Sequence, residues 1–302
     1  SYTSKELQLL IMTGGLSIRD LENLSGIKAH TIRIWEKRYN LFDPDRTETN
    51  IRNYSHEDLK KLLNIVSVLD NGMKISKATS LSEEELYSEI ESLQHENLES
   101  AKKIVVNELV VATLQCNVLG FEETYNRAFL HYGMEKAVEE IIYPLLVRIG
   151  LMWTVSKLNP AQEHFASQMV RQKLFAAIDK LTSKKTEKKY LLFLADNEDH
   201  EIGLLYAYFL IKQAGHECIY LGPSVPLDDV AYCCKIASIT DVLSIFTIPR
   251  PEELMHTYLG KMESLVKEAN IHISGVAEEF KADLPTNRFN FLHKIIDLTN
   301  II

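Results

Sequence analysis

The last third of the chain alternates between short apolar runs and longer amphipathic segments. The apolar runs have the length and composition of buried strands, and the segments between them have helical periodicity. This alternation predicts a doubly wound parallel sheet of the flavodoxin-like type, in which ligands lie beyond the carboxyl ends of the strands. The predicted strands are about 190–195, 217–221, 242–247 and 271–275, and the predicted helices are about 202–214, 226–238 and 252–269.

A short motif follows the first of these strands. Residues 198–203 read E-D-H-E-I-G, which resembles the E-x-H-x-x-G loop of base-off, His-on cobalamin-binding domains. The resemblance implies that His200 is the lower axial ligand of cobalt, in place of the cofactor's own benzimidazole, and that Gly203 leaves room for the corrin. Glu198 or Asp199 is expected to hydrogen-bond the second imidazole nitrogen, which fixes the tautomer of the ligand.

Later positions extend the same resemblance. Residues 221–226 read L-G-P-S-V-P and match the L-G-x-x-V-P loop, which implies that Val225 contacts the cofactor. Ser244 corresponds to the serine that lines the pocket for the nucleotide tail. The family usually carries Gly-Gly where this chain has Ser274 and Gly275. The extra hydroxyl is expected either to crowd the tail or to hydrogen-bond it.

The middle of the chain, residues 101–182, consists of successive amphipathic segments and predicts a four-helix bundle. Asn159 is a suitable N-cap and Pro160 a suitable first residue for the last of these helices. The predicted breaks between helices are at 117–120, 132–133 and 159–160.

Trp153 is followed after nine residues by Glu163 and His164. The pattern resembles the W-x9-E-H signature of the helical cap in CarH/LitR-type photoreceptors, and it implies that these three residues contact the upper face of adenosylcobalamin. Family members that form a bis-histidine adduct after illumination carry a histidine directly after the tryptophan. This chain has Thr154 there, so a permanent photoadduct is not expected.

The first 78 residues carry the signals of a DNA-binding head. Ser17 and Asp20 form a capping box for a helix over 18–24, Ser25-Gly26 makes a turn, and a second helix runs over about 28–39. Two short helices joined in this way predict a helix-turn-helix, and residues 43–54 predict a polar wing.

The head resembles the MerR family in the segment T-I-R-I-W-E at 31–36, in R-Y at 38–39 and in the wing. The resemblance implies contacts with double-stranded operator DNA that are mostly to phosphates. The helix supplies Arg33 and Arg38, and the wing supplies Arg46, Arg52 and Tyr54. The neighbouring polar side chains of the second helix, also assigned to DNA, are Lys28, His30, Thr31 and Lys37.

The charge of the chain is uneven. Residues 1–78 hold 12 Lys/Arg and 10 Asp/Glu and therefore carry a charge of +2. The remaining residues carry −11, which gives the net charge of −9. A basic face on the head is compatible with DNA in spite of the acidic total. The four cysteines form no C-x-x-C pair, and no apolar run is long enough for a membrane span. We expect a cytoplasmic protein with no membrane partner.

Four segments are predicted: a winged helix-turn-helix domain (1–78), a helical linker (79–100), a four-helix-bundle cap (101–182) and a cobalamin-binding sheet domain (188–302). Together they predict a cobalamin-sensing, light-responsive transcriptional repressor with no catalytic residues. The resemblance implies that adenosylcobalamin controls its oligomeric state, as a homodimer or tetramer, and its DNA binding. One alternative is a MerR-type repressor with a degenerate, cobalamin-independent oligomerisation module. The other is a corrinoid carrier of a methyltransferase, which the DNA-binding head disfavours.

Overall fold

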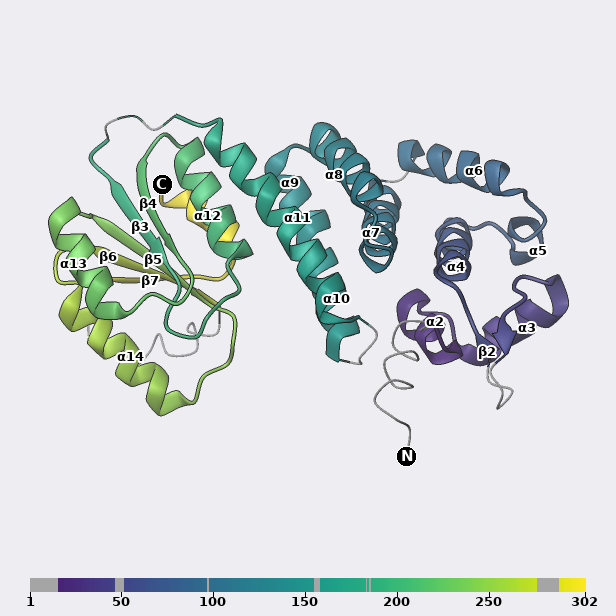
Figure 1. Ribbon diagram of the computed structural model, residues 1–302. Helices are drawn as coiled ribbons and strands as arrows, with labels where there is room; N and C mark the ends of the chain where they lie inside the picture. Colours follow the sequence, from purple (N-terminus) through teal and green to yellow (C-terminus); the bar gives the residue numbers. More distant parts are fainter. Residues whose placement is uncertain are drawn as a thin grey trace. The chain divides into compact units, whose positions relative to one another are not determined.

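The computed structural model describes residues 16–46, 52–96, 98–154, 158–182, 184, 186–275 and 288–302 (Figure 1). The chain divides into two compact units, Ser1–Ala166 and Ser167–Ile302. Among the described residues, no helix is both long and apolar enough to cross a membrane.

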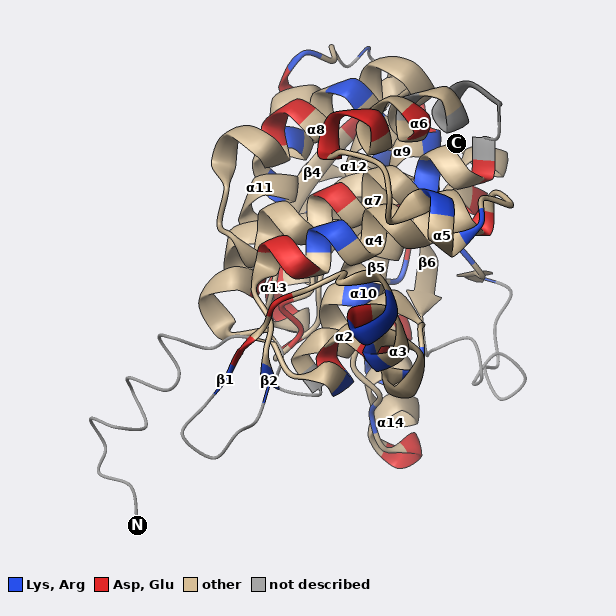
Figure 2. Cartoon of the chain, turned by 90° about the vertical axis from the view of Figure 1, so that its right-hand side faces the viewer, with Lys and Arg blue, Asp and Glu red and all other residues tan. Residues whose placement is uncertain are grey.

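The head, defined as residues 16–78, begins with the predicted helix-turn-helix. Ser17 and Asp20 form both hydrogen bonds of the capping box, and Gly26 ends the first helix with φ of +75°. Lys and Arg gather on α3 in Figure 2. Residues 47–51, which belong to the predicted wing, lie outside the described residues. The elements of the head are α2 (Ile18–Ser25), α3 (Ala29–Tyr39), the antiparallel strands β1 (Asp45–Arg46) and β2 (Arg52–Asn53), α4 (His56–Asp70) and α5 (Ile75–Ala78).

The segment expected to be a polar linker is a packed helix. Leu86 and Ile90 are buried, and the helix lies against α4 and α7. The break expected at 117–120 is shorter, because Asn117 caps the next helix and residues 118–120 form its first turn. The helices that follow the head are α6 (Glu83–Glu96), α7 (Leu98–Leu114), α8 (Val118–Tyr132), α9 (Met134–Ala137), the π-helix η1 (Val138–Ile142), α10 (Tyr143–Thr154) and α11 (Pro160–Asp179).

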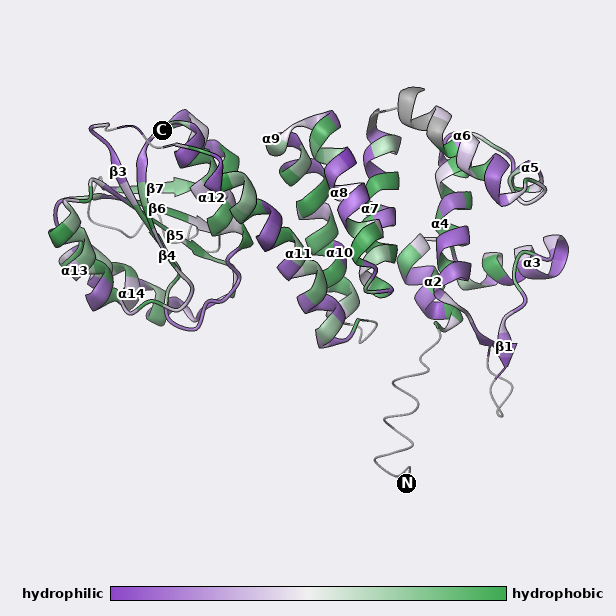
Figure 3. Ribbon diagram, turned by 45° about the horizontal axis from the view of Figure 1, so that its top comes forward, coloured by the Kyte–Doolittle hydropathy of each residue, from purple (hydrophilic) through white to green (hydrophobic). Residues whose placement is uncertain are grey.

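Helix α7 is the centre of the first unit. Hydrophobic residues run along it in Figure 3, and it contacts α4, α6, α8, η1 and α10. Ile104, Leu109 and Val110 are each at most 3% exposed. A helix that is apolar around most of its circumference must be covered on several sides, which explains why α7 joins the head to the bundle.

The second unit is the predicted parallel sheet, with strand order β4-β3-β5-β6-β7 and every pairing parallel. Helix α12 and the 3-10 helix η3 cover one face, and α13 and α14 cover the other (Figure 1). The fifth strand, β7, was not predicted from the sequence. The elements are β3 (Lys189–Phe193), α12 (Ile202–Gln213), β4 (Glu217–Gly222), α13 (Leu227–Ala237), β5 (Asp241–Phe246), α14 (Glu252–Leu265), β6 (Asn270–Gly275), β7 (Phe289–Leu292) and η3 (Ile295–Asn300).

The core of the sheet explains where the loops lie. Phe193, Phe246 and Ile273 belong to one buried cluster with Val230 and Leu259 of the covering helices. Because the first four strands run parallel, their carboxyl ends lie at the same edge of the sheet. The loops after β3, β4, β5 and β6 therefore meet at that edge.

Candidate functional site

The loop after β3 holds His200 at the sheet edge. Its Nδ1 lies 2.7 Å from Glu198 Oε1, and 62% of its side chain is exposed. Among the described residues, none hydrogen-bonds its Nε2. A carboxylate partner makes Nδ1 the protonated nitrogen, so the lone pair of Nε2 is available to a ligand.

Glu198 is fully buried and uses both carboxylate oxygens. Oε1 accepts from the His200 backbone N–H at 3.2 Å, and Oε2 accepts from the backbone N–H groups of Thr247 and Ile248 at 2.9 Å each. Burial alone would raise the pKa of Glu198, but these hydrogen bonds together with that from His200 Nδ1 lower it below its ordinary value. The carboxylate is thus held in its charged form and fixes the His200 ring.

The structure selects Glu198 rather than Asp199 as the partner of the imidazole. Asp199 Oδ1 accepts from Ser224 Oγ at 3.1 Å, which ties the loop after β3 to the loop after β4. Val225, half-buried in the second loop, donates its N–H to the Leu194 carbonyl at 2.9 Å. Two of the predicted loops are therefore brought together by hydrogen bonds.

Two glycines are required by close approach. A Cβ on Gly275, where φ is +91°, would lie 1.9 Å from the carbonyl oxygen of Phe246. A Cβ on Gly203 would lie 3.3 Å from Ile245 Cδ1, so Gly203 permits helix α12 to lie close to β5. A Cβ at Gly275 would overlap backbone, whereas one at Gly203 would press on the end of a side chain.

The two predicted serines differ in their partners. Ser244 is fully buried, and its Oγ has no hydrogen-bond partner among the described residues. Ser274 is 5% exposed and donates its Oγ to the Leu292 carbonyl at 3.2 Å. Since a buried hydroxyl without a partner is rare, Ser244 fits a ligand that supplies one. The hydroxyl of Ser274 is already used within the sheet.

The three residues predicted for the upper face belong to the helical unit. Trp153 lies in the last turn of α10 and is 47% exposed. Glu163 Oε2 lies 2.8 Å from His164 Nδ1 at the start of α11, where Asn159 Oδ1 accepts from the Gln162 N–H as the predicted N-cap. Their contact with a cofactor stays a prediction.

A buried ion pair near His200 was missed by sequence reasoning. Glu201 is 4% exposed, forms an ion pair with Arg171 of α11 and accepts from the Tyr220 hydroxyl at 2.5 Å. Glu201 is also the N-cap residue of α12. The position of Glu201 inside the E-D-H-E-I-G motif could have marked it as a site residue. Its partner Arg171 lies 30 residues earlier in the chain, and no sequence pattern links the two.

Helix α3 presents a basic face in the head (Figure 2). His30, Arg33 and Lys37 are exposed and recur at helical spacing, with Arg38 beside them over the ring of Tyr39. Other predicted DNA residues border this face: Lys28 is exposed and paired with Glu22 at 3.0 Å, Thr31 is half-buried and Arg46 is exposed.

The prediction that Tyr54 contacts DNA is wrong for this structure, since the residue is fully buried. Its hydroxyl donates to Glu36 Oε2 at 2.8 Å, and Arg52 Nε donates to Glu36 Oε1 at 2.8 Å. An aromatic ring gains more from burial against the small core of the head than from exposure in a wing. Arg52, half-buried, is engaged by Glu36.

Comparison with known proteins matches the head and the helices that precede the sheet. The family model of the MerR HTH family regulatory protein matches residues 16–85, and that of the B12 binding domain matches residues 105–177. These matches support a DNA-binding regulator of the MerR type that carries a cobalamin-binding module.

Two relatives share most of the chain. It is 26% identical over 264 residues to the HTH-type transcriptional repressor CarH of Myxococcus xanthus, covering 84% of this chain and 86% of that protein. It is 27% identical over 244 residues to the repressor CarA of the same organism, covering 79% of each. Among solved structures, the Methanosarcina barkeri monomethylamine corrinoid protein matches with a TM-score of 0.51 and 15% identity, covering 65% of this chain and 96% of that chain. That likeness shows the fold alone.

Proposed function

We propose that this protein is a transcriptional repressor whose DNA binding is controlled by adenosylcobalamin and by light. The observation that carries the proposal is the His200–Glu198 pair, in which a buried carboxylate fixes an exposed imidazole at the ligand edge of the sheet. Similarity to two repressors over most of the chain supports the regulatory part.

The sheet unit supplies the lower side of the site. Glu198 holds the proton on Nδ1 of His200, so Nε2 is the atom that binds cobalt. The hydroxyl of Ser244, which has no partner among the described residues, is assigned to hydrogen-bond the nucleotide tail. Gly203 and Gly275 lack side chains that would occupy space needed by the corrin. When bound, adenosylcobalamin supplies a light-sensitive cobalt–carbon bond.

Three residues of the helical unit are assigned to the adenosyl group. Trp153 covers the adenosyl group with an aromatic surface, and Glu163 accepts hydrogen bonds from ribose hydroxyls. His164, paired with Glu163, orients that carboxylate. Because Thr154 stands where adduct-forming relatives have a histidine, this position would supply no second histidine ligand to a bound cofactor.

The head binds operator DNA through α3 and the wing. Its cations contact phosphates and set the register of α3 in the major groove. Two heads act together in a homodimer or a larger homo-oligomer, whose assembly depends on the cofactor. The residues assigned to DNA are Lys28, His30, Thr31, Arg33, Lys37, Arg38, Arg46 and Arg52.

The test is an absorption spectrum of the full-length protein. The protein is mixed with adenosylcobalamin in darkness, desalted, measured, illuminated with green light and measured again. We expect about one cobalt per chain and a spectral change after illumination. His200→Ala removes the lower ligand, while His256→Ala, which changes a histidine on α14, is the matched control.

The two variants separate the outcomes. Loss of the His-on spectrum in His200→Ala and its retention in His256→Ala support the assigned ligand. A wild-type protein that retains no cobalamin overturns the cofactor control and leaves a MerR-type repressor with a degenerate module. Retained cobalamin with no effect of light overturns only the light response.

A further inference from the structure

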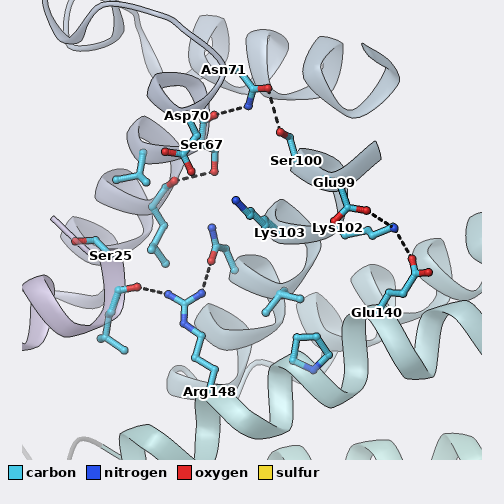
Figure 4. A pocket seen from close by; sticks show the side chains of 16 residues that line it. Ser25, Ser67, Asp70, Asn71, Glu99, Ser100, Lys102, Lys103, Glu140 and Arg148 are labelled. Atoms are coloured by element: carbon cyan, nitrogen blue, oxygen red, sulfur yellow. Dashed lines mark hydrogen bonds and ion pairs between the residues drawn. The ribbon is translucent and has the colours of Figure 1, made fainter. Parts of the chain in front are cut away.

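Arg148 of α10 connects the bundle to the DNA-binding head. Its guanidinium donates to the backbone carbonyl of Leu24 in α2 and to Oδ1 of Asn107 in α7 (Figure 4). Leu24 lies in the last turn of α2, where the final carbonyls of a helix have no partner within the helix. Burial lowers the pKa of Arg148 below its ordinary value, but the group stays charged in the physiological range.

The contact supplies what α2 lacks. Helix α2 has no basic residue in its last turn, although a cation there would be stabilised by the helix dipole. Arg148 provides that cation from a position 124 residues away in the sequence. The first helix of the helix-turn-helix is thus completed by a side chain of the bundle.

A cavity of about 580 Å3 lies next to this contact, between α2 and α4 of the head and α7, η1 and α10 of the bundle. The buried Lys102 on its wall is already paired with Glu99 at 2.7 Å and with Glu140. The cavity leaves part of the boundary between the head and the bundle unpacked, so a shift of the head meets less steric resistance there.

Helix α10 also carries Trp153, five residues after Arg148. Five residues of α-helix span about 7.5 Å, or roughly one and a half turns. A displacement of Trp153 therefore moves Arg148 if this part of α10 moves as a rigid body. The π-helix η1 immediately precedes α10, and π-helical turns next to α-helices are frequent at functional sites.

We propose that Arg148 is a positioning residue that transmits the cofactor state of α10 to the DNA-binding head. The inference rests on the proposed function, because it assumes that cofactor loss moves Trp153. With the cofactor bound, Arg148 stays on Leu24 and holds α2 and α3 in the DNA-binding arrangement. When the cofactor is lost, α10 shifts, the contact with Leu24 breaks and the head is released.

The experiment compares Arg148→Met with Gln115→Met in the full-length protein. Gln115 Nε2 also joins bundle to head, by a 2.8 Å hydrogen bond to Glu57 Oε1, but it lies on α7–α8 rather than on α10. The DNA probe is a duplex selected from a randomised pool by the wild-type protein loaded with adenosylcobalamin in darkness. The readouts are the DNA dissociation constants of loaded and cofactor-free protein, the cobalamin spectrum and far-ultraviolet circular dichroism.

We expect Arg148→Met to keep the wild-type cobalamin spectrum. The ratio of the DNA dissociation constant of cofactor-free protein to that of loaded protein is expected to fall at least about five-fold. Gln115→Met keeps the ratio. A folded Arg148→Met protein with the wild-type ratio overturns the proposal. If Arg148→Met does not fold, Arg148→Lys takes its place, since it keeps the charge but loses the two-pronged contact, and an unchanged ratio there counts equally against the proposal.

Failure of the underlying function gives a different pattern. In that case the wild-type protein itself retains no cobalamin, or its DNA dissociation constant does not depend on the cofactor. If DNA binding by Arg148→Met still depends on the cofactor as in the wild type, the proposed function stands. A contact other than that of Arg148 then links the cofactor site to the head.

Discussion

The hydroxyl of Tyr54 donates a 2.8 Å hydrogen bond to Glu36, which fixes the end of the wing to the recognition helix. Arg52 binds the other carboxylate oxygen of Glu36 over the same distance. Glu36, on the buried side of α3, thus sets the separation between α3 and the wing, the two parts of the head proposed to contact DNA. Its role is to shape the surface rather than to touch the nucleic acid.

Glu36→Gln is therefore expected to weaken DNA binding without removing a phosphate contact. The amide removes the negative charge that faces Arg52 and keeps only one acceptor oxygen, which costs about 1–3 kcal/mol of stability. The slope of log K against log salt concentration is expected to stay at its wild-type value. A reduced slope in salt titrations would show that a phosphate contact had been lost with Glu36.

Arg33→Ala and Lys37→Ala, unlike Glu36→Gln, are expected to lower the slope of log K against log salt concentration. Both side chains are exposed on α3, and each phosphate contact removed lowers the salt slope by about 0.9. Lys77→Ala is a suitable control, because Lys77 lies on α5 and pairs with Glu89 at 3.2 Å. Equal slopes for all three variants and the wild type would exclude the basic face of α3 as the DNA surface.

Gly275→Ala is expected to destabilise the sheet unit by more than about 2 kcal/mol, since φ is positive and the Cβ overlaps Phe246. Gly260→Ala in α14 is the matched variant, because nothing lies within 4 Å of its Cβ. Helix propensity predicts that it gains up to about 1 kcal/mol. Urea denaturation of both proteins measures the difference, and similar midpoints would contradict the close approach of β6 to β5.

Arg171→Met leaves the Glu201 carboxylate buried with only the Tyr220 hydroxyl as partner. We expect a loss of about 3 kcal/mol, the lower end for a broken buried pair, because a third of the Arg171 side chain is exposed. Lys261→Ala breaks a surface pair with Asp228 and is expected to cost less than about 1 kcal/mol. Thermal unfolding compares the two, and equal losses would mean that Glu201 is solvated.

The pKa of Glu198 gives a pH dependence with a definite sign. Because the folded-state pKa is lowered, its contribution to stability is complete above the unfolded value of about 4.3 and is lost as the pH falls through the folded value. The stability difference between wild type and Glu198→Gln is therefore expected to shrink below about pH 4. Denaturant curves between about pH 6 and pH 3 test this, and a difference that grows towards acid would reverse the assignment.

The same variant has a second readout. Loss of the carboxylate partner of a metal-binding histidine commonly costs 10–100-fold in metal affinity. Glu198→Gln is expected to retain about that much less cobalamin after desalting. Retention at the wild-type level would show that the imidazole does not need Glu198 to hold its orientation.

Local signals in the sequence predicted local structure well. The capping box of Ser17 fixes the start of α2, and Ser55 caps α4 in the same way. These boundaries depend on hydrogen bonds within four residues, which a sequence shows directly. The positions of strands β3 to β6 along the chain followed equally from the alternation of apolar runs.

Features set by distant partners were not predicted. Strand β7 is short and follows residues 276–287, which lie outside the described residues. The burial of Tyr54 depends on Glu36, and the ion pair of Glu201 depends on Arg171, both from other elements. For the loop motif, residue types alone left Glu198 and Asp199 equivalent, and only the backbone donors of Thr247 and Ile248 distinguish them.

The carboxylate of Glu198 is anchored by main-chain groups of the protein itself, independently of any bound molecule. The loop is consequently prearranged, and little ordering entropy is subtracted from the affinity for a ligand. Under the proposed function, a domain that has lost its cofactor would therefore need no refolding before it is filled again. The same molecule would then serve repeatedly, with its recovery limited by the supply of fresh cofactor rather than by new protein synthesis.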